Sequence, residues 1–177
     1  MKKINNFKFI YNNIDLIDNK FLLSIKKKII KKKISKFKIC LHKNKNYPVQ
    51  EMINFSYGFN YNRPHKHLSI VNESYHLIEG GMEIYMLDEK SEVIKKIKLH
   101  SDKKYRLPII FKINKPIFHF VVPSTKWLIY HEVTTGPWKD ELVKYAKFAP
   151  LGNNDNKGFE FYKVIKKKSK NLKWAKF

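Results

Sequence analysis

Cysteine, catalytic loop motifs and long apolar runs are scarce or absent in this sequence, and each absence excludes a class of protein. The single cysteine, Cys40, can form neither an internal disulfide nor, by itself, a thiolate metal site. We find no Walker-type phosphate loop, no GxSxG elbow and no Cys–His arrangement with evident spacing, so nucleophilic catalysis has little support. No apolar stretch approaches the length of a membrane span. Residues 1–13 lack the apolar segment and cleavage site of a signal peptide, so we expect a cytoplasmic protein.

Arginine is also scarce, which bears on the large positive charge. The chain has 37 basic and 15 acidic residues, a formal net charge of +22, yet only Arg63 and Arg106 are arginines. Such a charge suggests nucleic acid, but arginine is the residue suited to bidentate contacts with phosphates and bases. The abundance of Lys, Ile and Asn is typical of an A+T-rich genome. We therefore expect a solvated, compositional charge and no specific nucleic-acid partner; a functional anion-binding surface is the alternative.

The length of 177 residues suits one domain with three sections. Residues 1–47 are expected to form a helical preface, residues 48–138 a β-barrel, and residues 139–177 a basic extension that packs on the barrel or trails from it. Within the preface, Asp18 is a candidate N-cap for a helix with the lysines on one side. Its apolar face is predicted to contain Phe21, Leu22, Ile25, Ile29 and Ile30. A helix packed on the domain is the interpretation; a membrane-surface helix is the alternative.

Short segments rich in β-branched and aromatic residues follow one another between Pro48 and Pro137. They are separated by turn residues such as Gly58 and Gly80, and the segment 82–99 reads as a hairpin. Short strands at this regular spacing predict an all-β antiparallel sandwich or barrel.

A group of histidines and one carboxylate predicts a metal site. His65 and His67 alternate on a strand, so both can point to the same face. Glu73 follows after a tight connection, and His119 lies on a later strand from which it could return to the same cavity. Three imidazoles and a carboxylate suit a divalent transition metal such as Fe, Mn, Ni, Co or Zn.

The segments "RPHKH", "ESYHLIEG", "FHFVVP", "HEVTTGPW" and "KFAP" carry a resemblance to a known family. Their order resembles the cupin superfamily, and more closely the small WbuC-type cupin-fold metalloproteins of lipopolysaccharide O-antigen gene clusters. The resemblance runs from about Phe37 to about Pro150. It implies a double-stranded β-helix (jelly-roll) barrel and a metal at His65, His67, Glu73 and His119. The stretch "NKPIFH" before His119 lacks the Pro-x-Gly usual in the second cupin motif.

Other residues near these motifs have weaker assignments. His76 lies three residues after Glu73, so alternation places it on the opposite face, although whether His76 or His119 completes the site stays open. Arg63 is a candidate for binding a substrate carboxylate or phosphate. Tyr75 and His42 are further candidates for substrate binding, with a structural role as the alternative for each. Of His131 and its neighbour Glu132, one is expected to face the cavity.

These observations lead to a hypothesis about function with open alternatives. The chain is expected to be a mononuclear metalloenzyme acting on a small polar or anionic, sugar-related molecule in surface-polysaccharide biosynthesis. A metal-dependent isomerase, epimerase or oxygenase would fit. The alternatives are a non-catalytic sugar- or anion-binding module, and a basic protein that binds nucleic acid or a membrane surface. By resemblance alone, we expect a homodimer.

Overall fold

The computed structural model describes residues 7–12, 15–68, 71–152 and 155–175. Residues 1–6, part of the stretch inspected for a signal peptide, lie outside this range. Within the described ranges, no helix combines the length and apolarity needed to cross a membrane. The elements are β1 (Phe7–Phe9), α1 (Asn19–Lys31), β2 (Lys36–Cys40), β3 (Val49–Tyr57), β4 (His65–His67), β5 (Glu73–Glu79), β6 (Gly81–Leu87), β7 (Val93–His100), β8 (Ile110–Ile113), β9 (Phe118–Pro123), β10 (Trp127–Thr135), β11 (Val143–Tyr145) and α2 (Asp155–Lys168), with single 3₁₀ turns at Lys103–Tyr105 and Asp140–Leu142.

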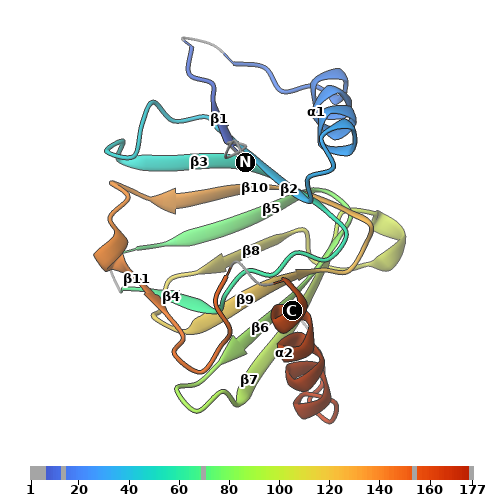
Figure 1. The fold of residues 1–177 in the computed structure, drawn as a ribbon, viewed down its shortest axis with the longest axis vertical. Coiled ribbons are helices and arrows are strands. Elements are labelled where there is room, and N and C mark those ends of the chain that lie inside the picture. The colour runs from blue at the N-terminus through green and yellow to red at the C-terminus, as the bar shows by residue number, and fades with distance from the viewer. Residues whose placement is uncertain (1–6, 13–14, 69–70, 153–154, 176–177) are drawn as a thin grey trace.

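Eight strands, β3 to β10, form the two facing sheets of a jelly roll (Figure 1). One sheet, here called sheet A, contains the order β3-β10-β5-β8, and the other, sheet B, contains β4-β9-β6-β7. All pairs among these strands are antiparallel. From β3 to β10 the chain changes sheet at every connection except the β6–β7 hairpin, which is the double Greek-key pattern of cupins. The protein is therefore all-β with a cupin-type barrel, as the sequence predicted.

The predicted hairpin is confirmed by the pairing of β6 with β7. Met82 lies opposite Leu99, and the register continues to Leu87 opposite Val93. The turn is organised by Asp88, whose Oδ1 accepts hydrogen bonds from the backbone N–H groups of Lys90 and Glu92, both at 2.8 Å. An aspartate that satisfies the turn backbone in this way is a common hairpin stop.

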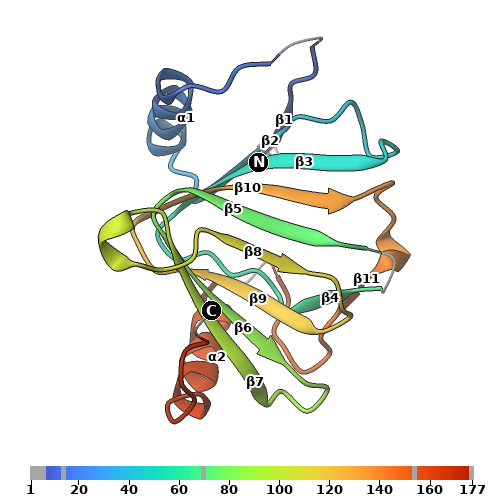
Figure 2. The same ribbon diagram turned by 180° about the vertical axis from the view of Figure 1, so that it is seen from behind.

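The predicted N-terminal helix is α1, and it covers the outer face of sheet A (Figure 2). Asp18 caps it, since its Oδ1 accepts a hydrogen bond of 2.7 Å from the Phe21 backbone N–H. The face buried against the sheet is narrower than predicted: Leu22, Ile25 and Ile29 are buried, whereas Ile30 is 55% exposed. These side chains pack with residues of β2, β3 and β10, namely Phe37, Ile39, Ile53, Phe55 and Ile129.

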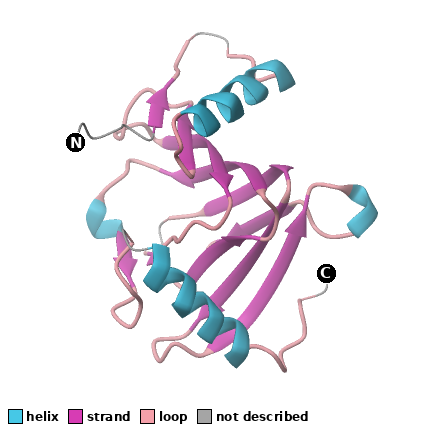
Figure 3. Cartoon of the chain, turned by 45° about the vertical axis from the view of Figure 1, so that its right-hand side comes forward, coloured by secondary structure: helices cyan, strands magenta, loops and turns pink. Residues whose placement is uncertain are grey.

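Both termini contribute structure beyond the predictions. In the N-terminal section, β2 pairs antiparallel with β3, and β1 pairs parallel with β2, so sheet A is widened by two strands. At the C-terminus, α2 covers the outer face of sheet B (Figure 3). Gly158 permits its close approach, because a Cβ there would lie 2.1 Å from the Tyr61 ring. This lysine-rich segment forms a stable helix because its few apolar residues pack against the outer face of sheet B.

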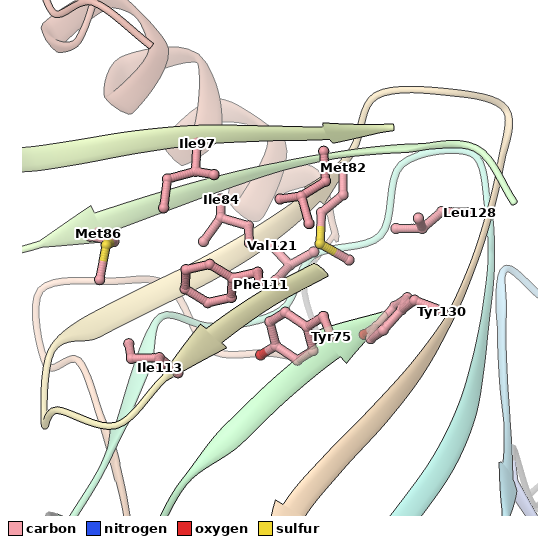
Figure 4. Packing of buried hydrophobic residues seen from close by; sticks show 11 residues of the cluster. Tyr75, Met82, Ile84, Met86, Ile97, Phe111, Ile113, Val121, Leu128 and Tyr130 are labelled. Atoms are coloured by element: carbon pink, nitrogen blue, oxygen red, sulfur yellow. The ribbon is translucent and has the colours of Figure 1, made fainter. Parts of the chain in front are cut away.

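The barrel interior is divided into an apolar end and a polar end. Side chains from both sheets fill the apolar end (Figure 4): Tyr75, Met82, Ile84, Met86, Ile97, Leu99, Phe111, Ile113, Val121, Leu128 and Tyr130. Toward the other end, alternate positions of β5 and β10 become polar, with Glu73 and Glu132 both facing inward. The apolar end supplies the packing that holds the two sheets together, and the polar end contains the groups that can do chemistry.

Neighbouring isoleucines on α1 give a matched test of the helix packing. Ile29 is fully buried and Ile30 is mostly exposed. We expect Ile29→Ala to lower the free energy of unfolding by about 2 to 5 kcal/mol, and Ile30→Ala to change it by about 0.5 kcal/mol or less. Urea denaturation followed by circular dichroism measures both. Equal losses in the two variants would contradict the placement of α1.

Candidate metal centre

Three histidines are brought together by strand pairing within sheet B. His65 on β4 lies directly opposite His119 on β9, and His67 is two residues further along β4 on the same face. The ring centroids of His65 and His119 are 4.7 Å apart, and those of His65 and His67 are 5.1 Å apart. The alternation predicted for His65 and His67 therefore positions both rings next to His119.

Glu73 completes the group from the opposite sheet. It is the first residue of β5 in sheet A, and its side chain is buried. Its Oε2 lies 3.0 Å from His119 Nε2 and 3.3 Å from His67 Nε2. One ligand atom from each of His65, His67, Glu73 and His119 lies within 4.8 Å of the others. Two ligands on opposite sides of an ion, each at about 2.1 Å, are about 4.2 Å apart, so small movements would let all four converge.

Backbone carbonyls orient two of the rings. His65 Nδ1 lies 3.1 Å from the Arg63 carbonyl oxygen, and His119 Nδ1 lies 3.1 Å from the Ile117 carbonyl oxygen. A carbonyl can only accept, so each Nδ1 carries the proton and each Nε2 is the nitrogen directed at the group. This is the arrangement by which proteins fix the tautomer of metal-ligating histidines.

The electrostatics of the group depend on Glu73. Burial alone would raise the pKa of Glu73, but the His119 and His67 rings hold it well below its usual value. Burial would lower the pKa of His119, but its hydrogen bond to Glu73 and the charge of that carboxylate raise it. Burial and the neighbouring His119 lower the pKa of His65 to about 3, so His65 is neutral. The surroundings of Glu73 thus favour a positive charge beside its carboxylate, which is what a bound cation would supply.

The residues fit a divalent metal ion. His67 Nδ1 is buried and has no hydrogen-bond partner among the described residues, and His67 Nε2 has only the 3.3 Å contact with Glu73 Oε2. Buried polar atoms are seldom left without a partner, and such an atom points to an ion or water that satisfies it. Three imidazoles and one carboxylate are a donor set for Fe, Mn, Ni, Co or Zn. The group could hold such an ion, whose identity the donor set does not determine.

His76 lies on the other face of sheet A, away from this group. It is opposite His131 in the pairing of β5 with β10, and their ring centroids are 5.7 Å apart. His131 Nε2 is 3.6 Å from Glu51 Oε1 on the same outer face. Among the described residues, His119 rather than His76 joins His65, His67 and Glu73.

The three candidates for substrate binding have different surroundings. Tyr75 faces inward, and its hydroxyl lies 3.4 Å from His119 Nε2. Arg63 donates from Nε and Nη2 to the Ala146 carbonyl at 3.1 and 2.7 Å, so these donors hold the chain near β11. His42 is buried, and its Nδ1 accepts a hydrogen bond of 3.1 Å from the Glu51 backbone N–H. All three line the cleft that also contains candidate metal ligands, and their roles in binding stay predictions.

A cleft of about 820 Å³ opens on three of the candidate metal ligands and is lined by several polar residues that the sequence did not single out. The sequence left His131 and Glu132 undecided, and the register resolves them: Glu132 lies inside the barrel. Glu132 Oε2 accepts a hydrogen bond of 2.7 Å from Asn54 Nδ2 and lies 3.8 Å from Lys38 Nζ. Burial raises the pKa of Glu132, the charge of Glu73 raises it further, and Lys38 opposes both. Strand alternation from Tyr130 to Glu132 was the available signal.

Comparisons with known proteins bear on the fold. A family model described as "Domain of unknown function (DUF6016)" matches residues 17–99. A search of curated proteins finds no match. The solved structure of CapF with the inhibitor 3-isopropenyl-tropolone has 15% sequence identity and a TM-score of 0.50, with 61% of this chain and 30% of CapF covered. This chain therefore spans less than a third of CapF.

Two further solved structures have similar identities. A cupin superfamily protein from Desulfitobacterium hafniense has 13% identity and a TM-score of 0.42, with 56% of this chain and 76% of that chain covered. KdgF from Halomonas sp. has 12% identity and a TM-score of 0.45, with coverages of 60% and 83%. The neighbours are cupin-fold proteins, and identities this low concern the fold alone. The strand order of the two sheets is that of a cupin-type barrel, and the candidate metal site lies inside this barrel.

Substitutions of inward and outward histidines separate the ligands from their neighbours. We expect folded His67→Ala to lose bound metal, because an inward imidazole is removed, and His76→Ala to keep it. Adding metal at about a hundred times its dissociation constant should stabilise the wild type and His76→Ala by about 2.7 kcal/mol, and His67→Ala much less. Metal per chain and thermal unfolding measure both effects. A His76→Ala variant that folds but loses its metal would show that the ligand set is wrong.

Proposed function

We propose that this protein is a mononuclear metal-dependent cupin that acts on a small, polar, sugar-related molecule. The observation that supports this most is the convergence of His65, His67, Glu73 and His119 at one side of a large cleft. Four protein ligands would leave coordination positions of a six-coordinate ion for water and substrate. The proposal that the substrate belongs to surface-polysaccharide synthesis is supported by the resemblance to WbuC-type proteins, and the homodimer stays a prediction.

The chain's own residues support chemistry at this place. A bound divalent ion would act as a Lewis acid toward a carbonyl or hydroxyl oxygen. Tyr75 would then place a hydroxyl donor beside the ligands, since its oxygen is 3.4 Å from His119 Nε2. Burial and the charge of Glu73 raise the pKa of Tyr75 well above its usual value, so its hydroxyl keeps its proton. Tyr75 is therefore suited to donate a hydrogen bond to a substrate oxygen.

The experiment that tests this function starts from protein purified without an affinity tag or added metal. Metal per chain is measured, the protein is loaded in turn with Fe, Mn, Ni, Co and Zn, and each form is incubated with a panel of nucleotide sugars. Mass spectrometry and NMR follow the products. We expect one metal form to convert one class of sugar. Stoichiometric metal with no conversion in any form would favour a non-catalytic binding module, and no metal under any condition would contradict the proposal.

Tyr75→Phe separates catalysis from metal binding. The variant lacks the hydroxyl but keeps the ring that packs on Phe111. We expect it to hold a normal amount of metal and to lower kcat by about a hundredfold, the usual cost of losing one well-placed donor. Undiminished turnover in the metal-loaded variant would exclude Tyr75 from the reaction.

A further inference from the structure

A second polar group lines the cleft on sheet A and is made of residues from three neighbouring strands. Lys38 on β2, Asn54 on β3 and Glu132 on β10 all face the cleft. Lys38 lies opposite Asn54 in the pairing of β2 with β3. Glu132 joins them, because Asn54 Nδ2 donates to its Oε2 at 2.7 Å and Lys38 Nζ is 3.8 Å away. None of the three residues is one of the four candidate metal ligands, although Glu132 lies beside Glu73.

The charges of this group favour a neutral ligand over an ion. The Lys38 ammonium lies beside the Glu132 carboxylate, so their charges offset each other. An anion bound here would also face the buried carboxylate of Glu73, and a cation would face Lys38. A ligand hydroxyl avoids both costs, because it can donate to the Glu132 carboxylate and accept from the Lys38 ammonium. Carboxylate, amide and ammonium side by side therefore suit a molecule with several hydroxyl groups.

Aromatic side chains provide an apolar surface in the same cleft. Phe7 and Phe9 on β1 both line it, although each is exposed by more than 40%. They are paired edge to face, with ring centroids 5.7 Å apart. A sugar ring has an apolar C–H face and a rim of hydroxyls, so it can pack on an aromatic ring while its rim hydrogen-bonds to polar groups. The cleft offers both kinds of contact within about 820 Å³.

We propose that Lys38, Asn54 and Glu132 form a hydroxyl-binding subsite for a neutral sugar ring, which enters between β1 and the candidate metal centre. This inference rests on the proposed function in one respect: the part of the ligand outside the subsite is taken to reach the metal. The Glu132 carboxylate accepts a hydrogen bond from a ring hydroxyl, and the Lys38 ammonium donates one to the oxygen of the same hydroxyl. Asn54 holds the Glu132 carboxylate in place. The subsite selects the sugar, and the metal centre acts on it.

The test pairs changes in the protein with changes in the ligand. The probes are the methyl glycosides of D-glucose, D-galactose and D-mannose, each with its single-deoxy derivatives, and dissociation constants are measured by calorimetry or ligand-observed NMR. The variants are Glu132→Gln and, because the Glu132 side chain is only 13% exposed, Lys38→Met at a position that is 38% exposed. Glu51→Gln is the matched control, since Glu51 lies near the outer histidines, outside the lining of the cleft. Metal per chain is measured for every variant.

We expect one glycoside to bind the wild type, and both variants to weaken it about tenfold or more. One deoxy derivative should show a similar loss with the wild type but little further loss with Glu132→Gln, because both changes remove the same hydrogen bond. Glu51→Gln should bind normally. Independent losses for every hydroxyl, an equal loss in Glu51→Gln, or no binding of any probe to the wild type would overturn the subsite.

Metal content distinguishes the failure of the subsite from the failure of the proposed function. If Glu132→Gln loses metal together with the sugar, Glu132 acts through Glu73 and the subsite is overturned. If the wild type holds metal but binds none of the glycosides, the subsite fails while the metal centre stands. If the wild type binds a glycoside through Glu132 but holds no metal, the subsite stands while the proposed function fails.

Discussion

The contact between Glu73 and the histidines is the interaction on which the polar end of the barrel depends. Glu73 starts a strand of sheet A, whereas His67 and His119 belong to sheet B, so this contact joins the two sheets across the interior. A buried carboxylate is costly unless it is paired. Here His119 pairs with it in the absence of an ion, and a divalent cation would pair with it more strongly. The same residue therefore ties the site to the fold and to the metal.

Packing in the apolar end of the barrel offsets the cost of burying polar groups at the other end. Its side chains come from both sheets and are almost completely excluded from solvent, and each sheet is also covered on its outer face by a helix. The sheets are held together by this packing, so the polar end can keep a buried group such as His67 Nδ1 without a hydrogen-bond partner among the described residues. Tyr75 and Tyr130 belong to the apolar cluster and also line the cleft, so the site is built directly on the core.

The sequence predicted the barrel well because its strands are short, apolar and separated by turn residues. Val49–Tyr57, Glu73–Glu79 and Val93–His100 are strands where the pattern predicted strands. The sequence did not predict β2. Phe37 and Ile39 alternate with lysines in this short strand, and they are buried only because they pack against α1 and β3. The helix α2 was missed for the same reason. It is stabilised by packing on sheet B despite its lysine-rich composition, and such a tertiary contact cannot be predicted from the local sequence.

For the site, the spacing of residues in the sequence predicted which side chains lie together when they share one strand. It did not do so for residues on different strands. Alternation was enough to place His65 with His67 and to turn His76 away from Glu73. His119 was placed in the group as a residue of a later strand that could return to the cavity, and by family resemblance. Its pairing with His65 was not predicted, because strand neighbours cannot be read from a single sequence. The contacts of Glu132 with Asn54 and Lys38 could not be predicted without the register of three strands.

The most direct test of the account is anomalous diffraction from crystals of the metal-loaded protein, with data collected on both sides of the metal's absorption edge. The account predicts one strong anomalous peak within ligand distance of Nε2 of His65, His67 and His119 and of a Glu73 carboxylate oxygen, with each Nδ1 of His65 and His119 still on its backbone carbonyl. A peak at His76 and His131 on the outer face, or no peak in the barrel of fully loaded protein, would contradict it.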